Sequence, residues 1–301
     1  MRRCFRFSLR AGLIESRKGS VLVMVLWILV LMSFLTSQYV AHNREKANIS
    51  RNAWSSFRQR QAIVSLTQLF STSAWPVPDG TGANGRWFRL YPDDIGVWVR
   101  VDKESSRLDL NSGNEGEIKQ KLSLMMDEKH QDEADAVSDA ILDWRDPDDM
   151  ARPHGAEAPA YAARGLNYRP ADGPFNALSE LLLVIGVTPN LFWGDPVRRI
   201  ETDLTRRLMV TDTAVQKDTV PDALSEIFTI YSQTGRRVSL LVPGEDNTYL
   251  YTNVILANVS GGFNVVDRQQ VFGVADPETY DRLTELESQV AKQESRDRAS
   301  R

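Results

Sequence analysis

Cysteine and histidine are scarce in this chain. The one cysteine, Cys4, lies near the basic N-terminus, so the rest of the chain can form no disulfide bond. The three histidines are scattered, and no H-E-x-x-H, G-x-S-x-G or phosphate-loop pattern occurs. These absences argue against metalloprotease, serine-hydrolase and nucleotide-hydrolysing chemistry, and we predict that the protein is not an enzyme.

Charge is missing from one long stretch of the sequence. No Lys, Arg, Asp or Glu occurs between Lys18 and Arg44, and residues 21–40 are mostly apolar. A helix rises about 1.5 Å per residue, so a segment of this length crosses a hydrocarbon core of about 30 Å. Apolar residues continue at helical spacing to Phe70, and Pro76 and Pro78 follow. We therefore predict one long transmembrane and stem helix over residues 20–75.

The two sides of this helix differ in charge. The leader, residues 1–19, holds six basic residues and one acidic residue of the chain's totals of 36 and 40, which leaves 30 basic and 39 acidic residues, a net charge of −9. Basic residues are retained on the cytoplasmic side of membranes, which predicts a single-pass protein with a short cytoplasmic N-terminus. An acidic remainder also argues against nucleic acid as a partner, because phosphate binding needs a cationic surface.

In the rest of the chain the residue pattern changes from strand-like to helix-like and back again. Residues 86–111 and 237–273 contain β-branched and aromatic runs typical of strands, whereas residues 112–236 show mostly helical spacing, including expected helices over 176–185 and 222–232. This order predicts an α+β fold, with a large, mostly helical domain inserted into one antiparallel sheet. The charged tail, residues 277–301, is predicted to be disordered.

The boundary between leader and helix resembles a known processing site. Lys18-Gly19 before an uncharged helix is similar to the junction in type IV prepilins and type II secretion pseudopilins. The resemblance implies that a prepilin peptidase cleaves after Gly19 and that Ser20 becomes the N-methylated first residue. It also implies that the apolar helix stays on the mature protein and packs on an antiparallel sheet.

One departure from that family pattern is informative. Most members carry Glu at the fifth mature position, where this chain has Met24. A buried carboxylate is costly without a positive partner, which in these filaments is thought to be the N-terminal amine of the subunit ahead. A subunit with nothing ahead has no such amine to neutralise. Lack of this Glu is typical of the type II secretion minor pseudopilin K family, which caps the filament tip.

Further segments resemble the K family in the family's order. They are L-D-L-N at 108–111, D-W-R-D-P-D-D at 143–149, G-A-E at 155–157, N-Y-R-P at 167–170 and the apolar block at 178–189. The resemblance implies a tip complex with minor pseudopilins of the I and J types, contact with the major pseudopilin, and support of protein export across the outer membrane. It places the chain in the bacterial inner membrane with a periplasmic C-terminal domain. The residues expected on the membrane and assembly helix are Met24, Leu26, Trp27, Leu31 and Phe34.

An acidic segment offers hard oxygen ligands. Calcium takes such ligands from flexible loops, and Pro147, Pro153 and Gly155 mark a loop. K-family relatives carry calcium at this kind of loop, so a structural Ca²⁺ is one interpretation. The alternative is a solvated acidic loop in which Asp143 pairs with a nearby arginine. The candidate ligands are Asp143, Asp146, Asp148, Asp149 and Glu157.

Two other interpretations of the whole chain stay open on sequence alone. One is a signal-anchored periplasmic calcium-binding module without a filament role. The other is a minor pilin of a type IV pilus or of an uptake machine, although the size of the helical insertion argues against it. His154, beside the acidic loop, is either a transition-metal ligand or a surface residue.

Overall fold

A computed structural model describes residues 18–72, 85–126, 128–209, 223–231, 235–260 and 262–299. The chain divides into two compact units, Met1–Trp54 and Ser55–Arg301. Most of the predicted leader, residues 1–17, lies outside the described residues, as do residues 73–84. The backbone at Gly19 and Ser20, on either side of the predicted cleavage site, is already helical.

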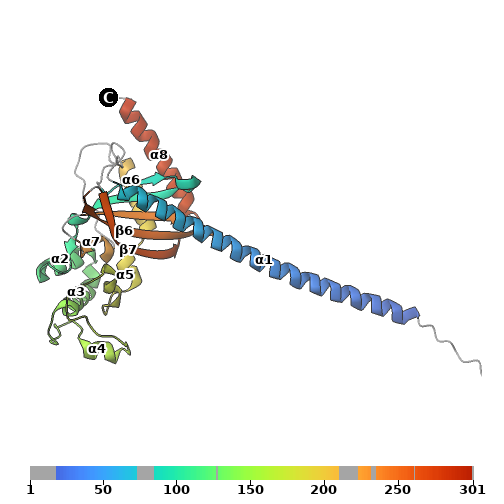
Figure 1. The fold of residues 1–301 in the computed structure, drawn as a ribbon, viewed down its shortest axis with the longest axis horizontal. Helices are drawn as coiled ribbons and strands as arrows, with labels where there is room; N and C mark the ends of the chain where they lie inside the picture. The colour runs from blue at the N-terminus through green and yellow to red at the C-terminus, as the bar shows by residue number, and fades with distance from the viewer. Residues whose placement is uncertain are drawn as a thin grey trace, which may run out of the picture. The chain divides into compact units, whose positions relative to one another are not determined.

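Helix α1 (Lys18–Ser71) passes through both units (Figure 1). It contains no proline, and its only glycine is Gly19 in the first turn, so nothing in its sequence interrupts the backbone hydrogen bonds. By length and composition it is long and apolar enough to cross a membrane. All the side chains described within the first unit, residues 21–54, are exposed. The predicted helix is therefore present, and it ends at Ser71.

The second unit is built on one antiparallel sheet. Its strands are β1 (Trp87–Leu90), β2 (Val97–Lys103), β5 (Gly235–Pro243), β6 (Thr248–Val259) and β7 (Gly262–Val274), and their order is β1-β2-β5-β6-β7. A short 3-10 helix, η1 (Pro92–Asp94), joins β1 to β2. The helical segment enters after β2 and returns to the sheet at β5. The predicted α+β fold, a long helix with an antiparallel sheet and an inserted helical domain, is confirmed.

The end of the strand-like segment expected over residues 86–111 does not join this sheet. A 3-10 turn, η2 (Glu104–Ser106), redirects the chain after β2. Strand β3 (Leu108–Asp109) then pairs in parallel with β4 (Phe228–Thr229) to form a separate two-stranded sheet. The backbone N–H of Leu110 extends this pairing by donating to the carbonyl of Thr229 at 2.8 Å. The sequence pattern showed an extended segment but not its partner.

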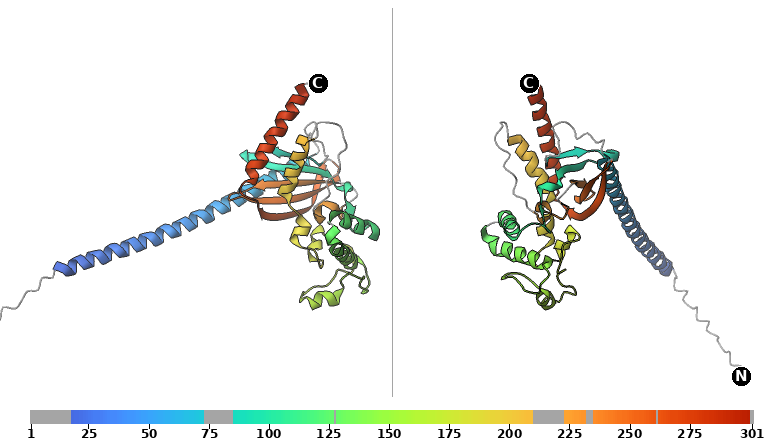
Figure 2. Two further views of the ribbon diagram at one scale, coloured as in Figure 1. Left: turned by 180° about the vertical axis from the view of Figure 1, so that it is seen from behind. Right: turned by 60° about the vertical axis from the view of Figure 1, so that its left-hand side comes forward.

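The alternation of side chains gives the main sheet two different faces. On one face, apolar residues of β2, β5 and β6, such as Val99, Leu240 and Val254, pack against Ile63 and Leu66 of α1. On the other face, residues such as Trp98 and Tyr251 join a second core that continues into the inserted domain. The sheet thus lies between the end of α1 and the helical elements, as Figure 2 shows.

The inserted domain consists of short helices. They are α2 (Glu115–Met125), 3-10 helix η3 (Glu128–His130), α3 (Gln131–Arg145), α4 (Ala158–Ala163), 3-10 helix η4 (Leu178–Leu183), α5 (Pro189–Trp193), α6 (Pro196–Met209) and α7 (Leu224–Ile227). Asn114 caps α2, because its side chain accepts from the N–H of Glu117 while Glu117 accepts from the N–H of Asn114. Thr188 caps α5 through the N–H of Leu191.

Two helices expected from the sequence are shorter than predicted. The expected helix over 176–185 is only the 3-10 helix η4, because Ala177 and Val184 are extended on either side of it. Among the described residues of the helix expected over 222–232, only α7 is helical, because Phe228 and Thr229 extend to pair with β3. At Phe228 and Thr229 the strand pairing overrides the local helical pattern.

The prediction of a disordered tail over 277–301 is wrong. Residues Thr279–Ala299 form helix α8, which lies beside α6 (Figure 1). Leu283 and Val290 are spaced two helical turns apart and are buried in the second core. Ion pairs Arg282–Glu201 and Arg89–Glu287 flank this apolar contact. The helix is ordered because it has an apolar face, although many of its residues are charged.

Candidate assembly helix, acidic loop and buried ion network

The candidate assembly residues form an exposed apolar surface on α1. Met24, Trp27, Leu31 and Phe34 follow an i, i+3, i+7, i+10 spacing and therefore share one face, with Leu26 beside them. All five side chains are exposed, between 56% and 68%. An apolar surface of this extent on a single helix requires lipid or protein to cover it. In this respect the segment has the properties that membrane anchoring and subunit packing both need.

The acidic loop follows helix α3 and is closed by an arginine. Asp143 is fully buried, and its carboxylate accepts hydrogen bonds from the Arg152 guanidinium at 2.7 Å and from the Arg152 backbone N–H at 3.2 Å. The same guanidinium also pairs with Asp146. A Cβ atom at Gly155 would lie 1.9 Å from a carboxylate oxygen of Asp143, so only glycine leaves room for this arrangement. In the structure Asp143 therefore pairs with an arginine, as one of the two interpretations of the acidic segment expected.

Glu157 differs from the other acidic residues of the loop. It is only 3% exposed, and neither carboxylate oxygen has a hydrogen-bond partner among the described residues. Burial, followed by the charges of Asp143 and Asp146, raises the pKa of Glu157 to about 7. A buried carboxylate without a partner is the feature that a bound cation would explain.

The remaining candidate ligands do not converge with Glu157. Asp148 accepts from the Met150 backbone N–H at 2.9 Å, and Asp149 is exposed. Within the described ranges, no group of three His, Cys, Asp or Glu side chains is arranged to hold a metal ion. His154 has an exposed imidazole, and its backbone N–H donates to Asp139. If a cation binds, Asp143, Asp146 and Glu157 are the nearest candidates, and Arg152 is its competitor.

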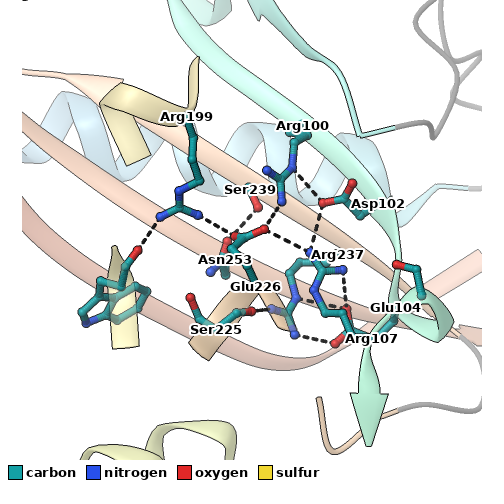
Figure 3. Close-up of polar contacts among 12 residues, drawn as sticks. Arg100, Asp102, Glu104, Arg107, Arg199, Ser225, Glu226, Arg237, Ser239 and Asn253 are labelled. Atoms are coloured by element: carbon teal, nitrogen blue, oxygen red, sulfur yellow. Dashed lines mark hydrogen bonds and ion pairs between the residues drawn. The ribbon is translucent and has the colours of Figure 1, made fainter. Parts of the chain in front are cut away.

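A buried ion network on the sheet was not foreseen from the sequence (Figure 3). It gathers four arginines and three carboxylates from β2, η2, α6, α7 and β5. Glu226 of α7 lies at its centre, where it pairs with Arg199 at 2.6 Å, with Arg100, and with Arg107 at 3.5 Å. The members of the network are Arg100, Asp102, Glu104, Arg107, Arg199, Glu226 and Arg237.

The electrostatics of this network hold Glu226 in the charged form. Glu226 is buried, and the neighbouring arginines, with Arg100 first, hold its pKa well below the usual range of a glutamate against the opposing effect of burial. Arg237 and Glu104 are both fully buried, and Arg237 Nε donates to Glu104 at 3.0 Å. Arg237 also donates to the backbone carbonyl of Ser225.

The network joins the inserted domain to the sheet. Arg100 and Arg237 stand on the sheet face opposite α1, whereas Arg199 and Glu226 belong to α6 and α7. A signal was present in β2, where Arg100 and Asp102 alternate with the apolar Val99 and Val101. The alternation marks a second packed face, but the partners lie far away in sequence and cannot be read from spacing.

These features define a protein with a long apolar N-terminal helix and a large helical insertion in its antiparallel sheet. Residues 106–193 match the family model of type II secretion system protein K. The family resemblance seen in the sequence is therefore confirmed over this segment, which begins at η2 and ends with α5.

The chain is similar to a known protein K sequence and to a chain in a solved structure. Type II secretion system protein K of Pectobacterium carotovorum subsp. carotovorum is 25% identical over 198 residues, which cover 58% of this chain and 60% of that protein. A chain in the crystal structure of the GspK-GspI-GspJ complex from the enterotoxigenic Escherichia coli type 2 secretion system is 15% identical. That likeness covers 76% of this chain and 99% of the other, with a TM-score of 0.39.

Proposed function

We propose that the protein is a minor pseudopilin at the tip of a type II secretion pseudopilus. The single observation that carries the proposal is the combination, in one chain, of an exposed apolar helix with a sheet that holds a protein K domain. The helix anchors the newly made protein in the inner membrane, with the leader in the cytoplasm and the sheet and inserted domain in the periplasm. It then packs against the helices of other subunits during assembly.

Association through the helix follows from the apolar surface that it offers. Burial of apolar area contributes about 25 cal/mol per Å² before the entropy of association is subtracted. Met24 extends this surface where most pilin-like subunits carry a carboxylate that needs a partner amine. A subunit with Met24 gains nothing from a neighbour's amine above it, which suits the first subunit of a filament. The partners proposed are the I-type and J-type minor pseudopilins and then the major pseudopilin.

Cysteine cross-linking tests this function directly. Once the leader with Cys4 is removed, the mature chain contains no cysteine, so a single introduced cysteine reports without background. We expect Leu31→Cys to form disulfide-linked species with cysteine-bearing helices of the I-type and J-type subunits. Met150→Cys, at an even more exposed position on the acidic loop, is the matched control and should not. Equal yields from both positions, or none from Leu31→Cys, would contradict helix-mediated assembly.

We further propose that Ca²⁺ binds at the acidic loop. The support is the buried carboxylate of Glu157, which has no hydrogen-bond partner in the part of the chain that the structure describes and feels the charges of Asp143 and Asp146. When bound, the ion would supply positive charge to a loop that has no disulfide to close it. The test is a calcium titration of the full chain followed by thermal unfolding with and without a chelator. A rise in unfolding temperature that Glu157→Gln abolishes supports the site, and no rise in the unmodified chain refutes it.

A further inference from the structure

Strand β7 is a long outer edge of the sheet. It contains 13 residues, whereas β1 at the opposite edge contains four. Its only strand partner in the described part of the chain is β6, apart from an isolated bridge between Gly262 and Thr72. Folded proteins usually shorten, cover or twist such an edge, because its free backbone groups can pair with another strand.

Four side chains of β7 extend the α1 side of the sheet beyond the area that α1 covers. Arg268, Gln270, Phe272 and Val274 alternate along the strand and share one face, and we call them the β7 strip. Phe272 lies opposite Leu250 in the register, and Leu250 is fully buried in the core beneath α1. Phe272 itself is 57% exposed and Val274 is 74% exposed. The apolar face of the sheet therefore continues uncovered onto β7.

The flank of α1 that lies toward β7 continues this surface. Phe57, Arg60 and Val64 are exposed and recur at i, i+3 and i+7, so they share one side of the helix. Arg58 donates to the carbonyl of Asp93 in the β1–β2 connection, which places Arg58 on the β1 side. Two residues turn a helix by about 200°, so Arg60 lies on the opposite flank, toward β7.

The charges around this surface indicate the chemistry of what covers it. Arg60 and Arg268 have no ion-pair partner among the residues that the structure describes, although the chain after the leader carries an excess of acidic residues. These two cations, one on the flank of α1 and one on the strand that carries Phe272 and Val274, match a segment in which acidic and apolar side chains alternate. That alternation is the pattern of a β-strand.

We propose that the β7 strip and the flank of α1 receive an edge strand from another pseudopilin subunit. The strand pairs with the backbone of β7, places apolar side chains on Phe272 and Val274, and places carboxylates at Arg60 and Arg268. This is strand addition to an existing sheet, in which the backbone gives affinity and alternate side chains give specificity. The inference rests on the proposed function, since it names a second contact in the same assembly.

The first experiment compares matched variants of the full chain, co-expressed with the I-type and J-type minor pseudopilins of the same secretion system. Phe272→Glu combined with Val274→Glu places two negative charges where the apolar side chains of the added strand are expected to pack. The amount of co-purified partner should fall by roughly tenfold or more. Leu124→Glu, on exposed α2 of the inserted domain, is the control and should leave the yield unchanged. Equal yields for the double variant and the control would overturn the inference.

The second experiment needs no variant and is independent of any folding defect. Amide hydrogen exchange is measured for the unmodified chain alone and in the complex. Slower exchange of β7 amides in the complex supports strand pairing, whereas unchanged exchange within a complex that forms overturns it. Slower exchange in the chain alone at rising concentration would instead identify a second copy as the occupant. Failure of the unmodified chain to bind either partner would refute the proposed function itself.

Discussion

The buried ion network allows a sharp prediction about how the inserted domain is held on the sheet. Glu226→Gln keeps the size of the side chain but removes the negative charge that faces Arg100, Arg107 and Arg199. Removing one partner of a buried ion pair costs about 3–5 kcal/mol, because the remaining charges stay buried without compensation. For a unit of this size that loss lowers the unfolding temperature by on the order of 10 °C.

The assay is thermal unfolding of the full chain in detergent, followed by tryptophan fluorescence. Trp87, Trp98 and Trp193 lie in the core that contacts this network, so their emission reports on its opening. Glu294→Gln is the matched control, because Glu294 pairs with Arg207 at an exposed position where an ion pair contributes about 1 kcal/mol or less. If Glu226→Gln destabilises the chain no more than Glu294→Gln, the network is not what holds the inserted domain.

The same substitution has a defined dependence on pH. Glu226 has a lower pKa in the folded protein than in the unfolded chain. Its contribution to stability is therefore fully present above the ordinary glutamate pKa of about 4.5 and is lost as the pH falls through the lower folded pKa. The difference between the unmodified chain and Glu226→Gln should shrink in that acidic range and stay constant near neutrality.

Three further outcomes are expected. Gly19→Leu should block removal of the leader, which electrophoresis would show as a larger product, and normal maturation would count against the processing site. With chelator present, the stability of the chain should fall as the pH rises from about 4.5 to 7, because the folded chain then keeps a proton on Glu157 that the unfolded chain has lost. Melting curves recorded across this pH range should show the fall, and Glu157→Gln should abolish it. Leu283→Ala should lower the free energy of unfolding by about 2–5 kcal/mol in denaturant titrations if α8 packs as described, and a change near zero would contradict that packing.

The sequence was sufficient for features that depend on local spacing. The uncharged run between Lys18 and Arg44 predicted helix α1. The β-branched runs on either side of a helical segment indicated the inserted domain. Thr188-Pro189 has the typical pattern of a helix start, and in the structure Thr188 is the N-cap of α5. In each case the signal and its cause lie within one turn or one strand.

The sequence was not sufficient where distant segments decide the structure. Helix α8 is ordered by its contact with α6, and nothing in its own charged sequence shows that contact. Strand β3 pairs with β4, more than a hundred residues away, and this pairing also cuts short the helix expected over 222–232. The acidic loop shows the same limit, because Arg152 lies within the segment but its pairing with Asp143 depends on how the loop folds back.

The most direct test of whether the apolar helix is kept on the mature protein is its intact mass. The protein is isolated from the inner membrane, and its N-terminus is fragmented in the mass spectrometer. We expect a chain that begins at Ser20, carries one methyl group on its amine and retains all of α1. A chain that still begins at Met1, or one that begins downstream of Val40, would contradict the claim that this helix is kept as an assembly surface.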